Sequence, residues 1–274
     1  MTFIFQHHEQ EVRRSYSLSS SPEVDENLSI TIKREPNGVI GRWMLANAQV
    51  GDILMALPPT GMFVITPQPT KPRDIFLIAA GSGITPIYSI LKSILIQEPE
   101  SKITLIYSNH EESTTIFLIA LLALQGRYRQ QLQIEFLFSN NQNIFKARLS
   151  ATSLEILFKR HLHFAKADAL VYTCGPWGYM QMVQIIALTN GFRKEHVRKE
   201  IFANGKEPLP AKQYFDHTDR NITIVHQQKE RIIFVPYNKS ILDAALESGI
   251  PIPYSCKAGR CKSIADRPVC NCHW

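Results

Sequence analysis

The sequence lacks the features that mark membrane-spanning and secreted proteins. Its longest apolar run, Ile116 to Leu124, is far shorter than the ~20 residues that a transmembrane helix needs. Residues 1–14 contain histidine and glutamate where a signal peptide has an apolar core. Five cysteines, an odd number with four in the last nineteen residues, do not form a secreted disulfide framework. These absences predict a cytoplasmic protein with no membrane partner.

Charge of one sign is not concentrated anywhere in the chain. The net charge is +6, and the basic residues occur in scattered pairs such as Arg13-Arg14 and Lys33-Arg34. Nucleic-acid binders carry a clustered basic stripe, so the pattern argues against a nucleic-acid partner. It suits anionic cofactors and an acidic protein partner equally well. The 274 residues, 45% of them hydrophobic, leave room for two or three domains with a full core.

One stretch organises the rest of the chain. A buried strand at Ile75–Ala80 runs into a glycine turn, and a helix begins near Thr85 and Pro86. Gly81 and Gly83 lack a Cβ, so a ligand can lie against the main chain. The free N–H groups and the positive dipole end of the helix suit a diphosphate. The stretch therefore predicts a nucleotide site, although glycines between a strand and a helix occur in many α/β folds.

From Asp74 onward, strands and helices alternate. The predicted strands are 75–80, 103–107, 133–138 and 169–173, and the predicted helices are 86–97, 114–126, 150–160 and 176–190. This alternation predicts a parallel sheet covered on both faces, with ligands at the carboxyl ends of its strands. The apolar run from Ile116 to Leu124 fits a packed helix of this domain.

The two ends of the chain have a different pattern. Short strands at Thr2–Phe5, Leu28–Lys33 and Ile53–Leu57, with a helical piece at Gly41–Ala46, predict a small antiparallel barrel or sandwich. Near the carboxyl terminus we expect strands at Ile222–His226 and Arg231–Val235 and a helix at Ser240–Glu247. The expected boundaries are 1–70 for the β domain, 71–203 for the α/β domain, 204–220 for a linker and 221–274 for the last domain.

The segment Arg14-Ser15-Tyr16-Ser17 is a candidate flavin site. On an extended strand, Arg14 and Tyr16 share one face while Ser17 points to the other. An arginine fork beside an aromatic ring and hydroxyls can hold a phosphate and a flat ring together. Taken alone, the segment is more typical of an ordinary edge strand with Tyr16 half buried.

Three motifs in order carry a family resemblance: Arg14-Ser15-Tyr16-Ser17, the Gly-Ser-Gly-Ile-Thr-Pro of residues 81–86, and Cys174-Gly175-Pro176. Together they resemble the ferredoxin-NADP reductase superfamily. With the plant-type ferredoxin segment near the carboxyl terminus, the chain resembles the reductase components of bacterial multicomponent oxygenases, above all those of phenylacetyl-CoA epoxidases. The resemblance implies an antiparallel flavin-binding barrel that is incomplete at its N-terminus, a parallel-sheet nucleotide-binding domain and a partial β-grasp ferredoxin domain.

The resemblance also implies roles for the residues of the flavin site. Arg14 binds the flavin pyrophosphate, Tyr16 stacks on the isoalloxazine and Ser17 bonds near its N5. The family's Gly-Gly-x-x-Ser phosphate turn corresponds to residues 37–43, which include Gly38, Gly41 and Arg42 and depart from that pattern. Backbone N–H groups at a helix start still bind phosphate. The resemblance implies FAD rather than FMN.

For the second cofactor, the resemblance implies a cradle for NAD(P)H built from Gly81, Gly83, Thr85 and Pro86. It places Cys174, with Gly175 and Pro176, beside the nicotinamide, where a thiol packs in a tight apolar slot without covalent chemistry. A plain buried cysteine is the alternative.

The resemblance places Ser108 and Asn109 beside the adenosine ribose. NADP-preferring relatives tend to have an arginine nearby, which forks onto the 2′-phosphate. Here residues 110–112 are His-Glu-Glu, which favours NADH, although Lys146 and Arg148 remain possible substitutes for that arginine. Glu200 is either part of the segment that closes the domain near the flavin or a solvated surface charge.

The expected iron–sulfur site is incomplete. Plant-type ferredoxins bind [2Fe–2S] through C-x4-C-x2-C and a distant fourth cysteine. Cys256 and Cys261 supply the first two metal ligands, but Ile264 stands at the third position and has no ligating atom. A zinc site that recruits Cys270 and Cys272 is a less favoured alternative. The short N-terminus and the unusual tail, 264–274, lead us to expect a chain truncated at both ends.

The resulting prediction is a flavin-dependent NAD(P)H oxidoreductase. Hydride passes from the nicotinamide to FAD, which passes electrons singly towards a [2Fe–2S] centre and an oxygenase partner, with the iron–sulfur step impaired. The cofactors carry the redox chemistry and the protein aligns them, so no catalytic side chain is assigned. The alternative is a non-catalytic remnant or partner-binding fragment of such a reductase.

Overall fold

The computed structural model describes residues 1–7, 10–24, 27–36, 38–202, 218–226, 229–250 and 252. These residues belong to two compact units. One comprises Met1, Tyr16–Leu54 and Phe63–Phe202, and the other comprises Thr2–Ser15, Met55–Met62 and Ala203–Trp274. Each unit is described separately below.

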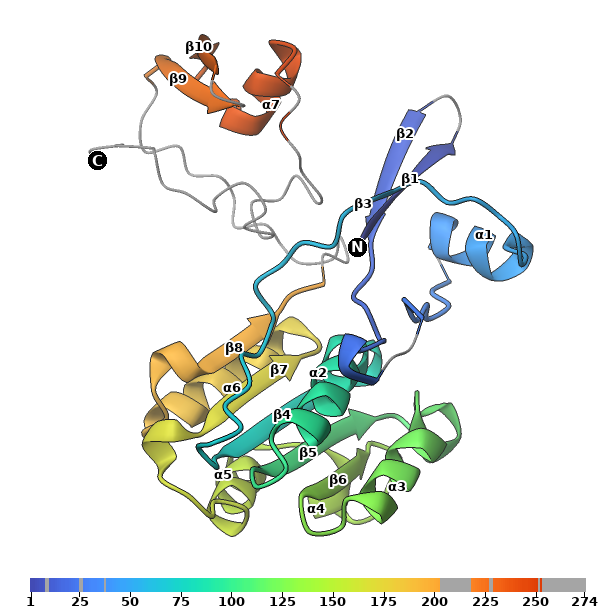
Figure 1. Cartoon of the computed structure of the whole chain (residues 1–274), viewed down its shortest axis with the longest axis vertical. Helices are drawn as coiled ribbons and strands as arrows, with labels where there is room; N and C mark the ends of the chain where they lie inside the picture. Colours follow the sequence, from blue (N-terminus) through green and yellow to red (C-terminus); the bar gives the residue numbers. More distant parts are fainter. Residues whose placement is uncertain are drawn as a thin grey trace. The chain divides into compact units, whose positions relative to one another are not determined.

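A five-stranded parallel sheet forms the centre of the first unit (Figure 1). The strands lie in the order β6-β5-β4-β7-β8, with bounds Leu132–Phe138, Lys102–Asn109, Asp74–Ala80, Leu170–Cys174 and Val197–Glu200. Every neighbouring pair is parallel, and the carboxyl ends of β4 and β5 coincide, because Ala80 pairs with Ser108. The four predicted strands and the parallel sheet are confirmed. The edge strand β8 was not predicted, because its sequence Val-Arg-Lys-Glu is polar.

Helices cover both faces of this sheet (Figure 1). The four long ones are α2 (Ile84–Gln97), α3 (Leu118–Arg127), α5 (Ala151–Arg160) and α6 (Trp177–Thr189), and a short α4 spans Ile144–Ala147. Residues of α2 and α3 form one apolar core with the sheet, and residues of α5 and α6 form a second core with its other face. The doubly covered sheet explains why β4 is buried along almost its whole length.

Helix α3 is less buried than its sequence predicts. The apolar run from Ile116 to Leu124 fits a packed helix, yet Leu121 is the one buried residue of α3, and Ile119 is 85% exposed. The helix also begins later than the predicted residue 114, after a 3₁₀ turn at Glu112–Thr114. Phe117 takes a left-handed backbone conformation (φ 61°) just before the helix begins.

The segment before the sheet packs within the same unit. Helix α1 spans Val39–Asn47, which confirms the predicted helical piece. Leu28–Lys33 is not a strand as predicted, because an isolated bridge from Ile30 to Leu18 is its one strand-like contact. Instead, Ser89 of α2 donates a hydrogen bond of 2.6 Å to the carbonyl oxygen of Ser20, which attaches the segment to the helix.

The second unit contains two small antiparallel sheets. Strands β1 (Thr2–His7), β2 (Gln10–Ser15) and β3 (Ala56–Leu57) pair in the order β2-β1-β3. The predicted strand Ile53–Leu57 is wrong at its start, because β3 contains only its last two residues.

The other sheet of this unit is the hairpin of β9 (Arg220–His226) and β10 (Lys229–Val235), followed by α7 (Ile241–Glu247). These elements confirm the three predicted in the carboxyl-terminal region. Ile233, Val235, Ala244 and Ala245 form a small core between the hairpin and α7, and the Ser240 hydroxyl caps the helix by accepting from the Asp243 N–H at 3.1 Å.

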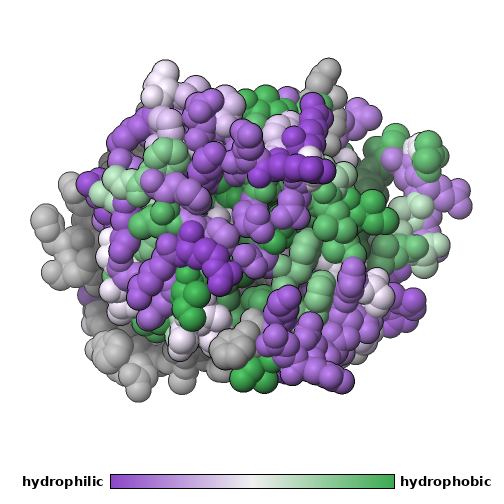
Figure 2. Space-filling model, turned by 90° about the horizontal axis from the view of Figure 1, so that it is seen from below, coloured by the Kyte–Doolittle hydropathy of each residue, from purple (hydrophilic) through white to green (hydrophobic). Residues whose placement is uncertain are grey.

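Across the part of the chain that the structure describes, no helix is long and apolar enough to cross a membrane. The face that Figure 2 shows is mixed, with hydrophilic side chains interspersed among hydrophobic ones.

Candidate nucleotide and flavin site

The glycine turn after β4 has the geometry predicted for a nucleotide site. A 3₁₀ turn at Gly81–Gly83 joins β4 to α2. Gly81 has φ +53°, and a Cβ built on it meets no described heavy atom within 4 Å. The Tyr107 hydroxyl donates a 3.1 Å hydrogen bond to the Gly81 carbonyl oxygen. The turn is thus held from the protein side and open on the side that a Cβ would occupy.

Gly83 serves a different purpose from Gly81. A Cβ on Gly83 would lie 2.1 Å from the Cys174 carbonyl oxygen and 2.9 Å from the Gly175 nitrogen. The glycine turn therefore touches the Cys-Gly-Pro turn that follows β7. Two predicted motifs that are about 90 residues apart in the sequence meet at the carboxyl edge of the sheet, where doubly wound folds bind their ligands.

The first turn of α2 is available to an anion. No described side chain caps this helix, whose N-cap is Gly83. Thr85 and Pro86 are both buried, and the Thr85 hydroxyl donates to the Ser82 carbonyl oxygen at 2.9 Å. These two residues therefore shape the turn from inside, and backbone N–H groups are the part of the turn that suits a diphosphate.

Ser108 and Asn109 end the neighbouring strand β5. The Ser108 hydroxyl lies 3.2 Å from the Tyr179 hydroxyl, which donates to the Ala79 carbonyl oxygen at 3.2 Å. The side-chain nitrogen of Asn109 is buried and has no hydrogen-bond partner among the described residues. A buried donor without a partner is costly, so a polar ligand at this edge would stabilise it.

Tyr179 was missed in the sequence, because a tyrosine on an apolar helix is usually a core residue. A Cβ on Gly175 would lie 2.9 Å from the Ala80 Cβ and 3.3 Å from the Tyr179 ring. Gly175 therefore leaves the space through which the ring reaches the ends of β4 and β5. Burial raises the pKa of Tyr179, so the hydroxyl keeps its proton.

Cys174 is fully buried at the end of β7. Burial, and then the negative charge of Glu200, raise the pKa of its thiol well above the usual range. Glu200 pairs in register with Cys174 on β8, and its own pKa is raised by burial. Glu200 is therefore a half-buried charge on the edge strand. The protonated thiol is a packing group at the carboxyl edge.

The residues of the predicted flavin site are partly brought together. Strand β2 ends at Ser15, so Tyr16 and Ser17 lie just beyond the strand that was expected to contain them. A Cβ on Gly41 would lie 3.6 Å from the Tyr16 hydroxyl. Gly41 belongs to the first turn of α1, whose N-cap Gly38 receives no side-chain cap from any described residue. The Tyr16 hydroxyl thus lies close to the start of α1, where backbone N–H groups suit a phosphate beside an aromatic ring.

The two arginines predicted for the flavin are exposed. Arg42 donates to the Pro36 carbonyl oxygen at 3.1 Å, which ties it to the residue before the turn. Arg14 donates to the Arg13 carbonyl oxygen at 2.8 Å. Both guanidinium groups have remaining N–H donors, because a guanidinium carries five.

The predicted metal ligands Cys256 and Cys261 lie outside the described residues, as does Asn37 of the phosphate turn. Across the ranges that the structure does describe, no group of three or more histidine, cysteine or acidic residues is arranged to hold a metal ion.

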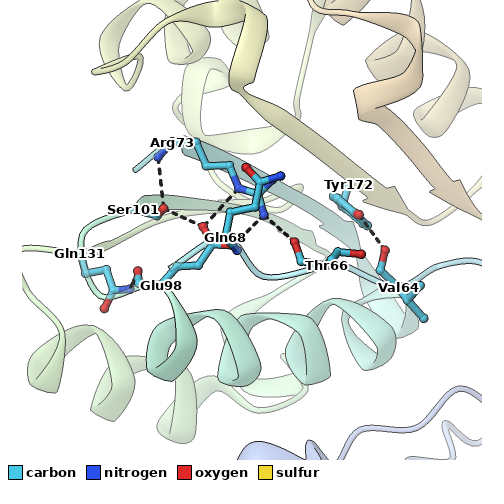
Figure 3. A network of polar contacts seen from close by, with 8 residues as sticks. All are labelled: Val64, Thr66, Gln68, Arg73, Glu98, Ser101, Gln131 and Tyr172. Atoms are coloured by element: carbon cyan, nitrogen blue, oxygen red, sulfur yellow. Dashed lines mark hydrogen bonds and ion pairs between the residues drawn. The ribbon is translucent and has the colours of Figure 1, made fainter. Parts of the chain in front are cut away.

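A buried polar network supports the start of β4 (Figure 3). Arg73 donates to both carboxylate oxygens of Glu98, at 2.6 and 3.2 Å, and the two side chains are 5% and 1% exposed. The carboxylate also accepts from the Ser101 hydroxyl at 2.7 Å and from the Gln68 N–H at 2.9 Å. The network holds the segment that leads into the sheet, because Arg73 also donates to the Thr66 carbonyl oxygen at 2.9 Å.

These features define a class of protein: a nucleotide-binding oxidoreductase of the ferredoxin reductase fold. Residues 77–185 match the family model described as "Oxidoreductase NAD-binding domain", and residues 224–263 match "2Fe-2S iron-sulfur cluster binding domain". The fold resembles that of a solved phthalate dioxygenase reductase, with a TM-score of 0.59 and 20% identity over 95% of this chain and 74% of that one.

Two curated relatives are similar over nearly the whole chain. The ferredoxin reductase component of 3-ketosteroid-9-alpha-monooxygenase from Mycobacterium tuberculosis (strain ATCC 25618 / H37Rv) is 33% identical, covering 93% of this chain and 68% of the relative. A component of 1,2-phenylacetyl-CoA epoxidase from Escherichia coli (strain K12) is 30% identical, covering 92% and 71%. The chain belongs to the family of reductase components of oxygenases, as its motifs predict. Its family implies FAD, NAD(P)H and a [2Fe–2S] centre as cofactors.

Proposed function

We propose that this chain binds NAD(P)H at the glycine turn and FAD beside Tyr16, and transfers electrons from the first to the second. The observation that carries the proposal is the contact between Gly83 and Cys174, which joins two nucleotide motifs into one surface. Gly81, Gly83 and the first turn of α2 hold the diphosphate. Ser108 and Asn109 face the adenosine ribose, and Cys174, Gly175 and Pro176 lie at the nicotinamide.

For the flavin, the space beside the Tyr16 hydroxyl and the first turn of α1 is the proposed phosphate site. Gly38 and Gly41 allow close approach of the main chain, while Ser17 and Arg42 supply donors. FAD, when bound, accepts a hydride and releases electrons singly. The protein needs no general acid or base, so its task is to align the two cofactors.

The proposed electron path ends at the flavin. Cys256 and Cys261 lie within the region that matches the cluster-binding family, but Ile264 replaces the third ligand. Because a side chain without a donor atom cannot bind iron, we derive no step through a cluster. We propose domain boundaries at 1–70, 71–203 and 221–274 with a linker at 204–220, and an oxygenase component as the kind of partner that the two named relatives serve.

The test is to purify the full chain, load it with FAD and measure NADH-dependent reduction of ferricyanide, with bound flavin, iron and sulfide quantified. Stoichiometric flavin, turnover of ferricyanide and no iron are the expected results. Absence of flavin binding and of turnover would overturn the proposal and leave a non-catalytic fragment. Stoichiometric iron and sulfide would overturn the proposal that the electron path ends at the flavin.

A further inference from the structure

The chain contains a hydrogen-bonded series in which the direction of one bond sets the direction of the next. Tyr179 of α6 lies between the Ala79 carbonyl oxygen and the Ser108 hydroxyl, at 3.2 Å from each. A carbonyl oxygen only accepts, and a protonated tyrosine has a single proton to donate. When that proton points at Ala79, the Ser108 hydroxyl must donate its own proton to Tyr179. The lone pairs of Ser108 are then left to accept from a ligand.

This direction discriminates between two ligands at the end of β5. A ribose 2′-hydroxyl can donate a hydrogen bond to an accepting serine, whereas a 2′-phosphate at neutral pH carries acceptors and needs donors. Ser108 is partly exposed, so a ligand can reach it. Residues 110–117, which follow the strand, contain two glutamates and no lysine or arginine, so the local charge also disfavours a 2′-phosphate.

We propose that Tyr179 positions the Ser108 hydroxyl as a hydrogen-bond acceptor and thereby selects the unphosphorylated adenosine ribose of NADH over that of NADPH. The inference rests on the proposed function, because it names the nucleotide for the same site. Tyr179 is a positioning residue: it acts through Ser108 and does not touch the reacting atoms.

The test measures binding of ADP-ribose and 2′-phospho-ADP-ribose to the full chain by titration calorimetry. Neither ligand contains the nicotinamide, so the measurement does not depend on turnover. Wild type is expected to bind ADP-ribose at least about tenfold more tightly. Ser108→Ala should weaken ADP-ribose binding by about three- to tenfold, the range for one neutral hydrogen bond, and leave the phosphorylated ligand unaffected.

Tyr179→Phe keeps the ring and removes the hydroxyl. Ser108 is then free to turn its proton toward a phosphate, so the preference should fall by about threefold or more. Tyr172→Phe is the matched control, because it also removes one buried hydroxyl bonded to a carbonyl, that of Val64 at 2.8 Å. That variant should keep the wild-type ratio even if both variants lose similar stability.

The outcomes separate the two proposals. Equal binding of the ligands by wild type, or tighter binding of the phosphorylated one, overturns the inference while the nucleotide site stands. A wild-type ratio in Tyr179→Phe overturns the role of Tyr179. Binding of neither ligand by wild type overturns both the nucleotide site and the inference that depends on it.

Discussion

The chain has two glycine-containing helix starts, and they are supported in different ways. The nucleotide turn, residues 81–86, lies at the end of a buried strand, and its Gly83 is packed against the main chain of Cys174. The flavin turn, residues 38–42, opens the exposed helix α1, in which Ile40 and Met44 are the buried residues. A Cβ on its Gly41 would make contacts of 3.5 and 3.6 Å, which are ordinary van der Waals distances.

This difference teaches why one motif is clearer in the sequence than the other. Internal packing requires glycine at position 83 whether or not a ligand binds. Little in the described protein requires glycine at position 41, so only a ligand would impose it. A departure from the family pattern, such as the one in residues 37–43, is therefore tolerated by the fold in the flavin turn and would not be tolerated in the nucleotide turn.

The largest effect is expected from breaking the network at the start of β4, the strand that ends at the nucleotide turn. Glu98→Gln keeps the shape but leaves the Arg73 guanidinium buried without a counter-charge. Loss of one partner of a buried pair costs about 3–5 kcal/mol, so the urea midpoint should fall strongly. The control is Asp168→Asn, which breaks the solvent-exposed Lys71–Asp168 pair (2.6 Å) and should leave the midpoint unchanged. Equal midpoints for both variants would contradict the assigned role of the network.

Gly83→Ala tests the packing of the nucleotide turn itself. The new methyl group would collide with the Cys174 carbonyl, and because the neighbour is backbone the strain should destabilise the fold by about 3 kcal/mol. Gly81→Ala is the matched control in the same turn. It meets no described neighbour, so only its left-handed φ of +53° should matter, at about 1–2 kcal/mol. The free energy of unfolding is measured in urea. A smaller decrease for Gly83→Ala than for Gly81→Ala would show that the glycine turn does not pack against the Cys-Gly-Pro turn.

The same substitution in the flavin turn should have the opposite sign. Gly41→Ala adds a methyl group inside helix α1 without a clash, so we expect a stability gain of about 0.5–1 kcal/mol. The methyl group also enters the space beside the Tyr16 hydroxyl, so FAD should bind more weakly. Quenching of flavin fluorescence on binding measures this affinity. Unchanged affinity would remove the flavin phosphate from this turn.

Most of the α/β fold could be predicted because its signals are local. The apolar strands and the glycine turn each determine a short segment, and the parallel sheet follows from the alternation of strands and helices. The predicted strand at Leu28–Lys33 was wrong because its β-branched residues find a strand partner only at Ile30. Local propensity does not supply the partner strand that a sheet requires.

The site was predicted in its residues but not in its connections. Gly81, Gly83 and Cys174 were identified from motifs. The contact between the glycine turn and the Cys-Gly-Pro turn depends on the strand order, which cannot be read from the sequence. Tyr179 was missed because its contacts with the ends of two strands depend on how the sheet is assembled. Glu200 was left undecided for the same reason: its burial depends on β8 pairing with β7.

The smallest effect we predict is the dependence of stability on the titration of Glu200. This residue pairs with Cys174, whose main chain packs against the nucleotide turn. Its pKa is raised by burial, so as pH rises above the ordinary value of 4.5 the unfolded chain loses this proton before the folded chain does. Stability should therefore fall as pH rises from 4.5 to the raised pKa, and Glu200→Gln should remove that decline from thermal unfolding curves.

Glu135 should change stability with pH in the opposite direction, because a hydrogen bond from His161 lowers its pKa. Its stabilising contribution is present above pH 4.5 and is lost as pH falls through the lowered pKa. Glu135→Gln should accordingly flatten the acid side of the profile alone. If the stability of Glu200→Gln still declined above pH 4.5, the prediction for Glu200 would be wrong. Glu200 would then be solvated, and the sheet edge beside Cys174 would be open to water.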